Sequence, residues 1–198
     1  MLAGSASATV YSGARSDPSG DGPVPGQDVV NGKARYDNVS GTLDFEVRLR
    51  APAEGDLQIT TGVGRFTESG TCASPIIALG TFLPGGGTVW VLETDGSTPA
   101  EQQGEGTRTI SGSSYSLRAV DSRLKGLKPN CADVILSDPD DPATVYDQAS
   151  TFAVKPPPPK PRLKVKAGKT GPLKRGAART IAFRVSNTGN APARSSTS

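Results

Sequence analysis

The chain contains no histidine. This absence excludes Ser-His-Asp and Cys-His catalysis, histidine-ligated zinc, and the side chain that most often exchanges protons near neutral pH. With only two cysteines, the chain also lacks the CxxC spacings of zinc and redox sites. Paired carboxylates are the catalytic option left, and Asp44 and Glu46 form the clearest pair. Both occupy the polar side of an alternating segment, as on a solvated strand face, so we expect that the protein is not an enzyme.

Aromatic residues and long apolar runs are scarce too. Aromatics make up 5% of the chain, and no run approaches the roughly 18 apolar residues that a membrane helix needs. We therefore expect no membrane span. The single tryptophan, Trp90, is the one candidate for stacking a sugar ring in a ligand site, whereas its apolar neighbours Val89 and Val91 are typical of a core strand. Both interpretations of Trp90 stay open at this point.

Glycine and proline are abundant, with 24 Gly and 17 Pro and no collagen-like period. Together with Asp and Ser they form turn signals that separate short patches of alternating apolar and polar residues. Strands are predicted at 8–11, 29–36, 42–50, 57–62, 76–82, 88–93, 107–110, 115–120, 132–136 and 151–154. Many short strands with frequent turns favour an all-β fold, an antiparallel β-sandwich of Ig-like or jelly-roll-like type. A short helical turn is predicted near 122–126.

The sharpest boundary in the chain is the proline-rich segment 155–161. Consecutive prolines have a fixed φ and no N–H donor, so they form a polyproline II rod rather than a sheet strand. We predict a linker at 155–161 between a β-sandwich domain at 9–154 and a second β module at 162–198. From Lys155 onward lie eleven of the 22 Lys and Arg residues and none of the 19 Asp and Glu, so the first 154 residues carry a net charge of −8.

The basic tail permits two interpretations. A block of positive charge is often only a solvated surface, but it also attracts anionic wall polymers, lipids or an acidic partner. Nucleic acid is not expected, because Phe183 is the only aromatic residue of the tail and no recognition motif accompanies it.

Segment 162–193 contains two patches of alternating apolar residues, followed by Asn187, Gly189 and Ala191. This pattern resembles the opening of CARDB-type bacterial cell-adhesion modules, in which a v-x-N-x-G-x-A turn follows a strand. The resemblance covers about a third of a complete module. It implies a second β-sandwich that is cut short in this chain and a protein of the bacterial surface. Two strands cannot bury a core by themselves.

Calcium is the one metal for which the chain offers ligands, because it binds carboxylates and loop carbonyls. Asp17, Asp21 and Asp28 cluster in one Gly/Pro-rich loop, and three further aspartates cluster at 138–141. Neither cluster follows the EF-hand register, and aspartate is also a common turn residue, which is the alternative for both. No other cofactor is expected. The loop that starts at Asp17-Pro18 also resembles the entry of DOMON-like sandwiches of secreted proteins, some of them sugar-associated.

Cys72 and Cys131 form either a disulfide or two free thiols, and we favour the disulfide because several features indicate export. Residues Ala6-Ser7-Ala8 match the small-x-small pattern before a signal-peptidase cut, so 1–8 is either the remnant of a signal peptide or a disordered start. An extracellular or cell-surface location is therefore expected.

Three functions remain as hypotheses. The first is a non-enzymatic, secreted or cell-surface structural or binding module related to adhesion. The second is a carbohydrate-associated accessory domain of a longer secreted enzyme. The third is binding of an anionic cell-wall polymer by the basic C-terminal segment. The partner itself, whether a surface polymer, a glycan or a protein, stays open.

Overall fold

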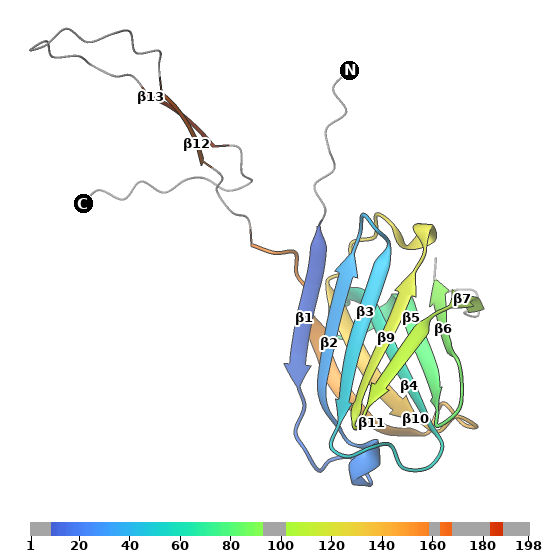
Figure 1. Ribbon diagram of the computed structural model, residues 1–198. Helices are drawn as coiled ribbons and strands as arrows, with labels where there is room; N and C mark the ends of the chain where they lie inside the picture. Colours follow the sequence, from blue (N-terminus) through green and yellow to red (C-terminus); the bar gives the residue numbers. More distant parts are fainter. Residues whose placement is uncertain (1–8, 93–101, 159–162, 168–182, 188–198) are drawn as a thin grey trace, which may run out of the picture. The chain divides into compact units, whose positions relative to one another are not determined.

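The computed structural model describes residues 9–92, 102–158, 163–167 and 183–187 (Figure 1). The chain divides into two compact units, Met1–Pro157 and Pro158–Ser198, and each is described by itself.

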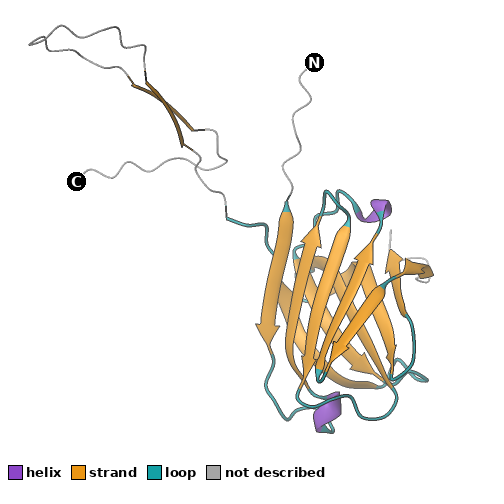
Figure 2. Ribbon diagram, in the orientation of Figure 1, coloured by secondary structure: helices purple, strands orange, loops and turns teal. Residues whose placement is uncertain are grey.

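The first unit consists of two antiparallel sheets that face each other, as Figure 2 shows. Sheet A has the order β1-β2-β3-β9-β8, with β1 at Val10–Ser16, β2 at Val29–Asp37, β3 at Thr42–Leu49, β9 at Ser114–Val120 and β8 at Thr107–Ser111. Sheet B has the order β11-β10-β4-β5-β6-β7, with β11 at Val145–Ala153, β10 at Cys131–Ser137, β4 at Leu57–Phe66, β5 at Cys72–Leu83, β6 at Thr88–Leu92 and β7 at Gln102–Glu105. The predicted all-β sandwich is confirmed.

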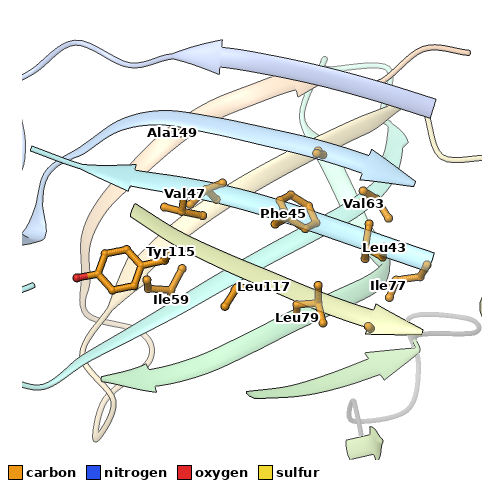
Figure 3. Close-up of a cluster of buried hydrophobic side chains, with 14 of the residues drawn as sticks. Leu43, Phe45, Val47, Ile59, Val63, Ile77, Leu79, Tyr115, Leu117 and Ala149 are labelled. Carbon is orange, nitrogen blue, oxygen red and sulfur yellow. The ribbon is translucent and has the colours of Figure 1, made fainter. Parts of the chain in front are cut away.

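The core lies between the two sheets and follows directly from the alternation in the sequence. On β3, Leu43, Phe45 and Val47 are buried, and the charged residues between them lie on the outer face of sheet A. Figure 3 shows these side chains pointing toward apolar residues of sheet B such as Ile59 and Leu79. A period of two therefore places every second side chain in the core, and this burial is the main stabilising contribution to the fold.

The observed strands agree with most of the predicted ones, and the differences have physical reasons. Strand β7, at Gln102–Glu105, is polar and has no alternation, and it is held at the sheet edge by its ladder to β6. Strands β4, β5 and β11 are longer than predicted, because backbone pairing continues beyond the apolar patches, in β11 through register shifts against β10. The helical turn expected near 122–126 is a 3₁₀ turn, η2, at Ser122–Leu124; a second, η1, at Pro25–Gln27, was not expected.

Lys155, the first residue of the predicted linker, is bridged to strand β1 of the first unit. Ser12 of β1 donates its N–H to the carbonyl of Lys155 at 2.9 Å, and Lys155 donates back to Ser12 at 3.0 Å. This bridge joins the edge strand of sheet A to the residues that follow the edge strand of sheet B. The prolines Pro156–Pro158 are exposed, and the rest of the predicted rod lies outside the described residues.

In the second unit, the two predicted strands form an antiparallel pair, β12 at Leu163–Ala167 and β13 at Phe183–Asn187, with Val165 opposite Val185. Their apolar side chains Leu163, Val165 and Val185 are more than half exposed. Throughout the described part of the chain, no helix has the length and hydropathy that a membrane crossing requires.

Candidate functional site

The two cysteines form a disulfide, and no cysteine is free. Cys72 begins β5 and Cys131 begins β10, and these two strands flank β4 in sheet B. Their Cα atoms lie 5.7 Å apart, an ordinary distance for a disulfide. The bridge closes a loop of 59 residues and ties one end of sheet B together.

An open groove of about 520 Å³ crosses the outer face of sheet A. All five strands of that sheet contribute to its lining. Its polar residues are Ser12, Lys33, Arg35, Asp44, Glu46, Thr107, Thr109, Ser116 and Arg118. Phe45 is the one aromatic residue among those that line the groove. Its ring is buried in the core, so it does not offer a stacking surface to a ligand.

The charged side chains of the groove form cross-strand ion pairs. Lys33 Nζ lies 2.9 Å from Glu46 Oε1. Arg35 and Arg118 approach the two oxygens of Asp44 from opposite sides, at 3.4 and 3.6 Å. The register explains this pattern, since Lys33 lies opposite Glu46, Arg35 opposite Asp44, and Asp44 opposite Arg118. The sequence identified Asp44 and Glu46 as a carboxylate pair on a solvated face; the structure shows that each is matched by a cation.

Sequence reasoning missed the basic residues of this groove. The available signal was the short connection between β2 and β3, at 38–41, which sets the register of the two alternating strands. That register alone would have placed Lys33 and Arg35 beside the acidic residues of β3. The contributions of β8 and β9 carried no such signal, because these strands are far from β3 in the sequence.

Two of the three predicted calcium ligands, Asp17 and Asp21, come together at the connection between β1 and β2. One carboxylate oxygen each of Asp17, Asp21 and Asp147 lie within 4.8 Å of one another. The third predicted ligand, Asp28, is fully buried just before β2. Asp147 of β11 was not predicted, because it lies 119 positions after Asp28 and only the stacking of the two sheets brings it to this loop.

Main-chain donors fix the two buried carboxylates of this cluster. Gly20 donates its N–H to Asp28 Oδ2 at 2.6 Å, and Val29 donates to Asp147 Oδ2 at 2.6 Å. Asp147 Oδ1 accepts the N–H of Gln148 at 2.7 Å. Asp28 Oδ1 is buried and has no hydrogen-bond partner among the described residues. Burial, with smaller contributions from the charges of Asp21 and Asp28, raises the pKa of Asp147 above its usual value.

The second acidic loop does not share this arrangement. Asp138 Oδ1 accepts the N–H groups of Asp140 and Asp141 at 2.8 and 3.2 Å, and its Oδ2 accepts the Tyr146 hydroxyl at 2.7 Å. These bonds lower the pKa of Asp138, and the bond from the Tyr146 hydroxyl makes the largest contribution. The aspartates at 138–141 therefore shape a turn, which was the alternative interpretation of this cluster.

Trp90 is a core residue, with 2% of its surface exposed. The guanidinium of Arg123 lies 4.8 Å from the centre of its ring, and Gly104 of β7 lies so close to the indole that a Cβ there would fall 2.5 Å from Nε1. A sugar has no access to either face of this ring, so the stacking role considered for Trp90 does not fit its position.

The paired strands of the second unit have one apolar and one basic face. Lys164, Lys166 and Arg184, with Ser186, line an open depression of about 590 Å³. The register places Lys166 opposite Arg184, so like charges stand side by side with no acidic residue in the tail to neutralise them.

No protein-family model, curated protein or solved structure matches this chain. The class of this protein is therefore described from its structure alone: it is an all-β sandwich with one disulfide, a charged groove and a carboxylate cluster.

Proposed function

We propose that this protein is a non-enzymatic, exported module of the cell surface that binds an anionic polymer on the outer face of sheet A. The observation that carries the proposal is the groove to which all five strands of that sheet contribute. Sheet faces present side chains at regular spacing, so a groove across several strands matches an extended chain with repeating groups.

Export is supported by the Cys72–Cys131 disulfide. Such bonds persist in oxidising compartments and are rare in the cytosol, where thiols are kept reduced. The resemblance of segment 162–193 to CARDB-type modules supports a location at the bacterial surface, and the pairing of β12 with β13 is compatible with it.

The chemistry of the groove favours an anionic ligand. Arg35 and Arg118 are each about half exposed, and their pairs with Asp44 are longer than 3.3 Å. Exposed ion pairs of this kind contribute only about 0–1 kcal/mol, so a ligand carboxylate or phosphate can replace Asp44 as the partner. A guanidinium binds such groups through two parallel hydrogen bonds. None of the described residues that line the groove exposes an aromatic ring, so ion pairing and hydrogen bonding, rather than stacking, would hold the ligand.

The test measures binding of the full chain to immobilised teichoic acid and to an acidic polysaccharide, with a neutral glucan as reference. We expect Arg118→Ala to weaken binding at least about tenfold, as for loss of one charge-assisted contact. Arg65→Ala is the matched control, because Arg65 is an exposed arginine on β4 of the other sheet. Equal losses in both variants, or no binding by the wild type, would contradict the proposal.

The basic face of β12 and β13 supports a second candidate, in which the tail binds the anionic polymer. Here the triple variant Lys164→Gln, Lys166→Gln, Arg184→Gln would lose binding while Arg118→Ala retains it. Binding through clustered lysines weakens strongly between 50 and 500 mM salt, because exposed charges are screened. Equal binding at both salt concentrations would exclude this candidate.

The third candidate, a carbohydrate-associated accessory domain of a longer secreted enzyme, predicts saturable binding to the neutral glucan. Trp90→Ala does not test it, because removing a buried tryptophan costs about 3–5 kcal/mol of stability whatever the ligand. The groove variants described above are the informative ones.

A further inference from the structure

The carboxylate cluster beside the β1–β2 connection has the spacing of a metal site. Two oxygens that bind one calcium ion at 2.3–2.6 Å cannot be more than about 5 Å apart. The oxygens of Asp17, Asp21 and Asp147 meet this limit, since they lie within 4.8 Å of one another. These three residues come from the loop after β1 and from β11, so the spacing is a property of the folded sandwich.

Asp28 provides an independent indication of a ligand. Its side chain is 1% exposed, and its Oδ1 has no hydrogen-bond partner among the described residues. A buried carboxylate oxygen without a partner costs free energy unless a donor or a cation satisfies it. The Asp28 carboxylate is held beside the cluster, because Gly20, between Asp17 and Asp21, donates to its Oδ2. Its charge also acts on Asp147.

We infer that Asp17, Asp21 and Asp147 bind calcium at a site that joins the two sheets of the sandwich, with the buried carboxylate of Asp28 beside it. The ligand set consists of oxygen alone, and the chain has no histidine and no free thiol to offer a softer metal. Arg50, 3.5 Å from Asp28 Oδ2 and half exposed, balances one of the four negative charges. Calcium accepts irregular arrangements of several carboxylates, whereas magnesium demands a nearly octahedral set and keeps most of its water.

The site has a structural consequence. The connection between β1 and β2, which carries η1, lies at one end of the sandwich in Figure 1. Asp147 already accepts the N–H of Val29 across the gap between β11 and β2. A cation shared by Asp147 and the loop aspartates replaces carboxylate repulsion with attraction at this junction. Calcium is then a stabilising ligand of the exported protein, at the 10⁻⁴–10⁻³ M affinities that are typical of extracellular modules.

The test uses the full chain after treatment with a chelator and removal of the chelator. Thermal unfolding is measured as calcium chloride is added up to 100 mM, and isothermal titration calorimetry gives the stoichiometry. We expect one calcium ion per chain and a rise in Tm of about 5–10 °C when calcium reaches 100 times its Kd. Magnesium chloride at the same concentration should give a clearly smaller rise.

Asp21→Asn is the decisive variant, because Asp21 is exposed and its substitution does not disturb the core. We expect it to lose most of the calcium-dependent rise in Tm. In chelator it should unfold at the same temperature as the wild type or higher, since one repelling charge is gone. A residue with a purely structural role would instead lower Tm in chelator.

Asp140→Asn is the matched control, since Asp140 is an exposed aspartate of the acidic loop at 138–141. It should keep the full response to calcium. The inference is overturned if calcium leaves Tm unchanged, if magnesium acts equally, or if Asp21→Asn responds as the wild type does. None of these results depends on the polymer that sheet A binds.

Discussion

Tyr36 donates its hydroxyl to the main-chain carbonyl of Leu124, and so ties strand β2 to the turn η2 in the connection between β9 and β10. The same oxygen accepts the N–H of Leu127 at 3.1 Å. Tyr36 is 1% exposed and Leu124 is fully buried, so the bond between them is shielded from water. One side chain of sheet A thus satisfies two backbone groups of a connection that returns to sheet B.

The first prediction is that Tyr36→Phe lowers the free energy of unfolding by about 1–3 kcal/mol. The substitution keeps the ring in the core but leaves the carbonyl of Leu124 and the N–H of Leu127 unpaired, and buried unpaired groups carry that cost. Chemical denaturation in urea measures the change. Tyr11→Phe is the control, because Tyr11 is only partly buried and should change stability by less than about 0.5 kcal/mol. Equal effects of the two variants would show that the bonds to Tyr36 contribute nothing specific.

The same hydroxyl predicts an alkaline loss of stability. Burial, the largest cause, raises the pKa of Tyr36 from 10.0 to about 12. Because the folded-state pKa is the higher one, the contribution of the neutral phenol is complete below pH 10 and is lost as the pH rises toward 12. We expect the wild type to lose more stability than Tyr36→Phe across this interval. Denaturation midpoints of both proteins at pH 9, 10 and 11 measure it, and parallel pH profiles would contradict this origin.

Much of this fold was predictable, because alternation with a period of two is a local property. The strands around Leu43–Leu49 and Tyr115–Val120 follow from it directly. Strand β7 was not predictable, since the polar segment Gln102–Glu105 is a strand only through its hydrogen bonds to β6. Local pattern thus determines which side chains enter the core, while edge strands depend on partners that are distant in sequence.

The candidate sites also contain some residues that local sequence pattern identified and others that only the folded structure brings together. Asp17, Asp21 and Asp28, three of the four carboxylates at or beside the site, lie in one loop. The sequence alone identified this loop, because its Gly and Pro residues are typical of turns. The fourth, Asp147, reaches them only through the stacking of two sheets. Trp90 shows the converse: its neighbours on the strand were compatible with either role, and the packing of Gly104 and Arg123 against its ring decides for the core.

We expect removal of the Cys72–Cys131 disulfide to cause the largest loss of stability among these predictions. Reduction of Cys72–Cys131, or the double variant Cys72→Ser, Cys131→Ser, frees a loop of 59 residues in the unfolded chain. The chain-entropy model then gives a loss of about 4 kcal/mol. Guanidinium denaturation with and without dithiothreitol measures it, with the double variant as the control that must not respond to the reductant. An unchanged midpoint on reduction would show that the bridge does not constrain the unfolded state.

The raised pKa of Asp133 predicts that the stability of the protein falls as the pH rises from about 4 to about 6. This residue of β10 is partly buried, and desolvation raises its pKa from 3.8 to about 6. Hydrogen bonds from the main chain of Gly62 and from its own N–H act in the opposite direction. Since the folded-state pKa is the higher one, the favourable contribution of the neutral carboxyl is complete below pH 4 and is lost above pH 6. Asp133→Asn resembles the neutral form at every pH. We expect it to stabilise the protein by about 3 kcal/mol at pH 8 and to have little effect at pH 4.

Thermal unfolding of the wild type and of Asp133→Asn at pH 4, 6 and 8 measures this difference. Asp56→Asn is the control, because Asp56 is exposed in the loop before β4. An advantage of Asp133→Asn that is equal at pH 4 and pH 8 would show that burial of the charge is not its cause.

The last prediction concerns the closure of the sandwich along the edge where β1 meets the end of β11. A Cβ added at Gly13 would lie 2.1 Å from the carbonyl oxygen of Ala153, a distance that backbone atoms cannot accommodate without moving apart. Gly13→Ala must therefore displace β1 and strain the adjoining bridge between Ser12 and Lys155. Overpacking of this kind costs about 1–3 kcal/mol. Gly85→Ala is the control, because no atom lies within 4 Å of a Cβ at that position. Urea denaturation compares the two variants, and hydrogen exchange of the Ser12 and Lys155 amides shows whether the loss occurs at this edge. If Gly13→Ala left both the midpoint and these amides unchanged, the close approach of the two sheets at Gly13 would not contribute to stability.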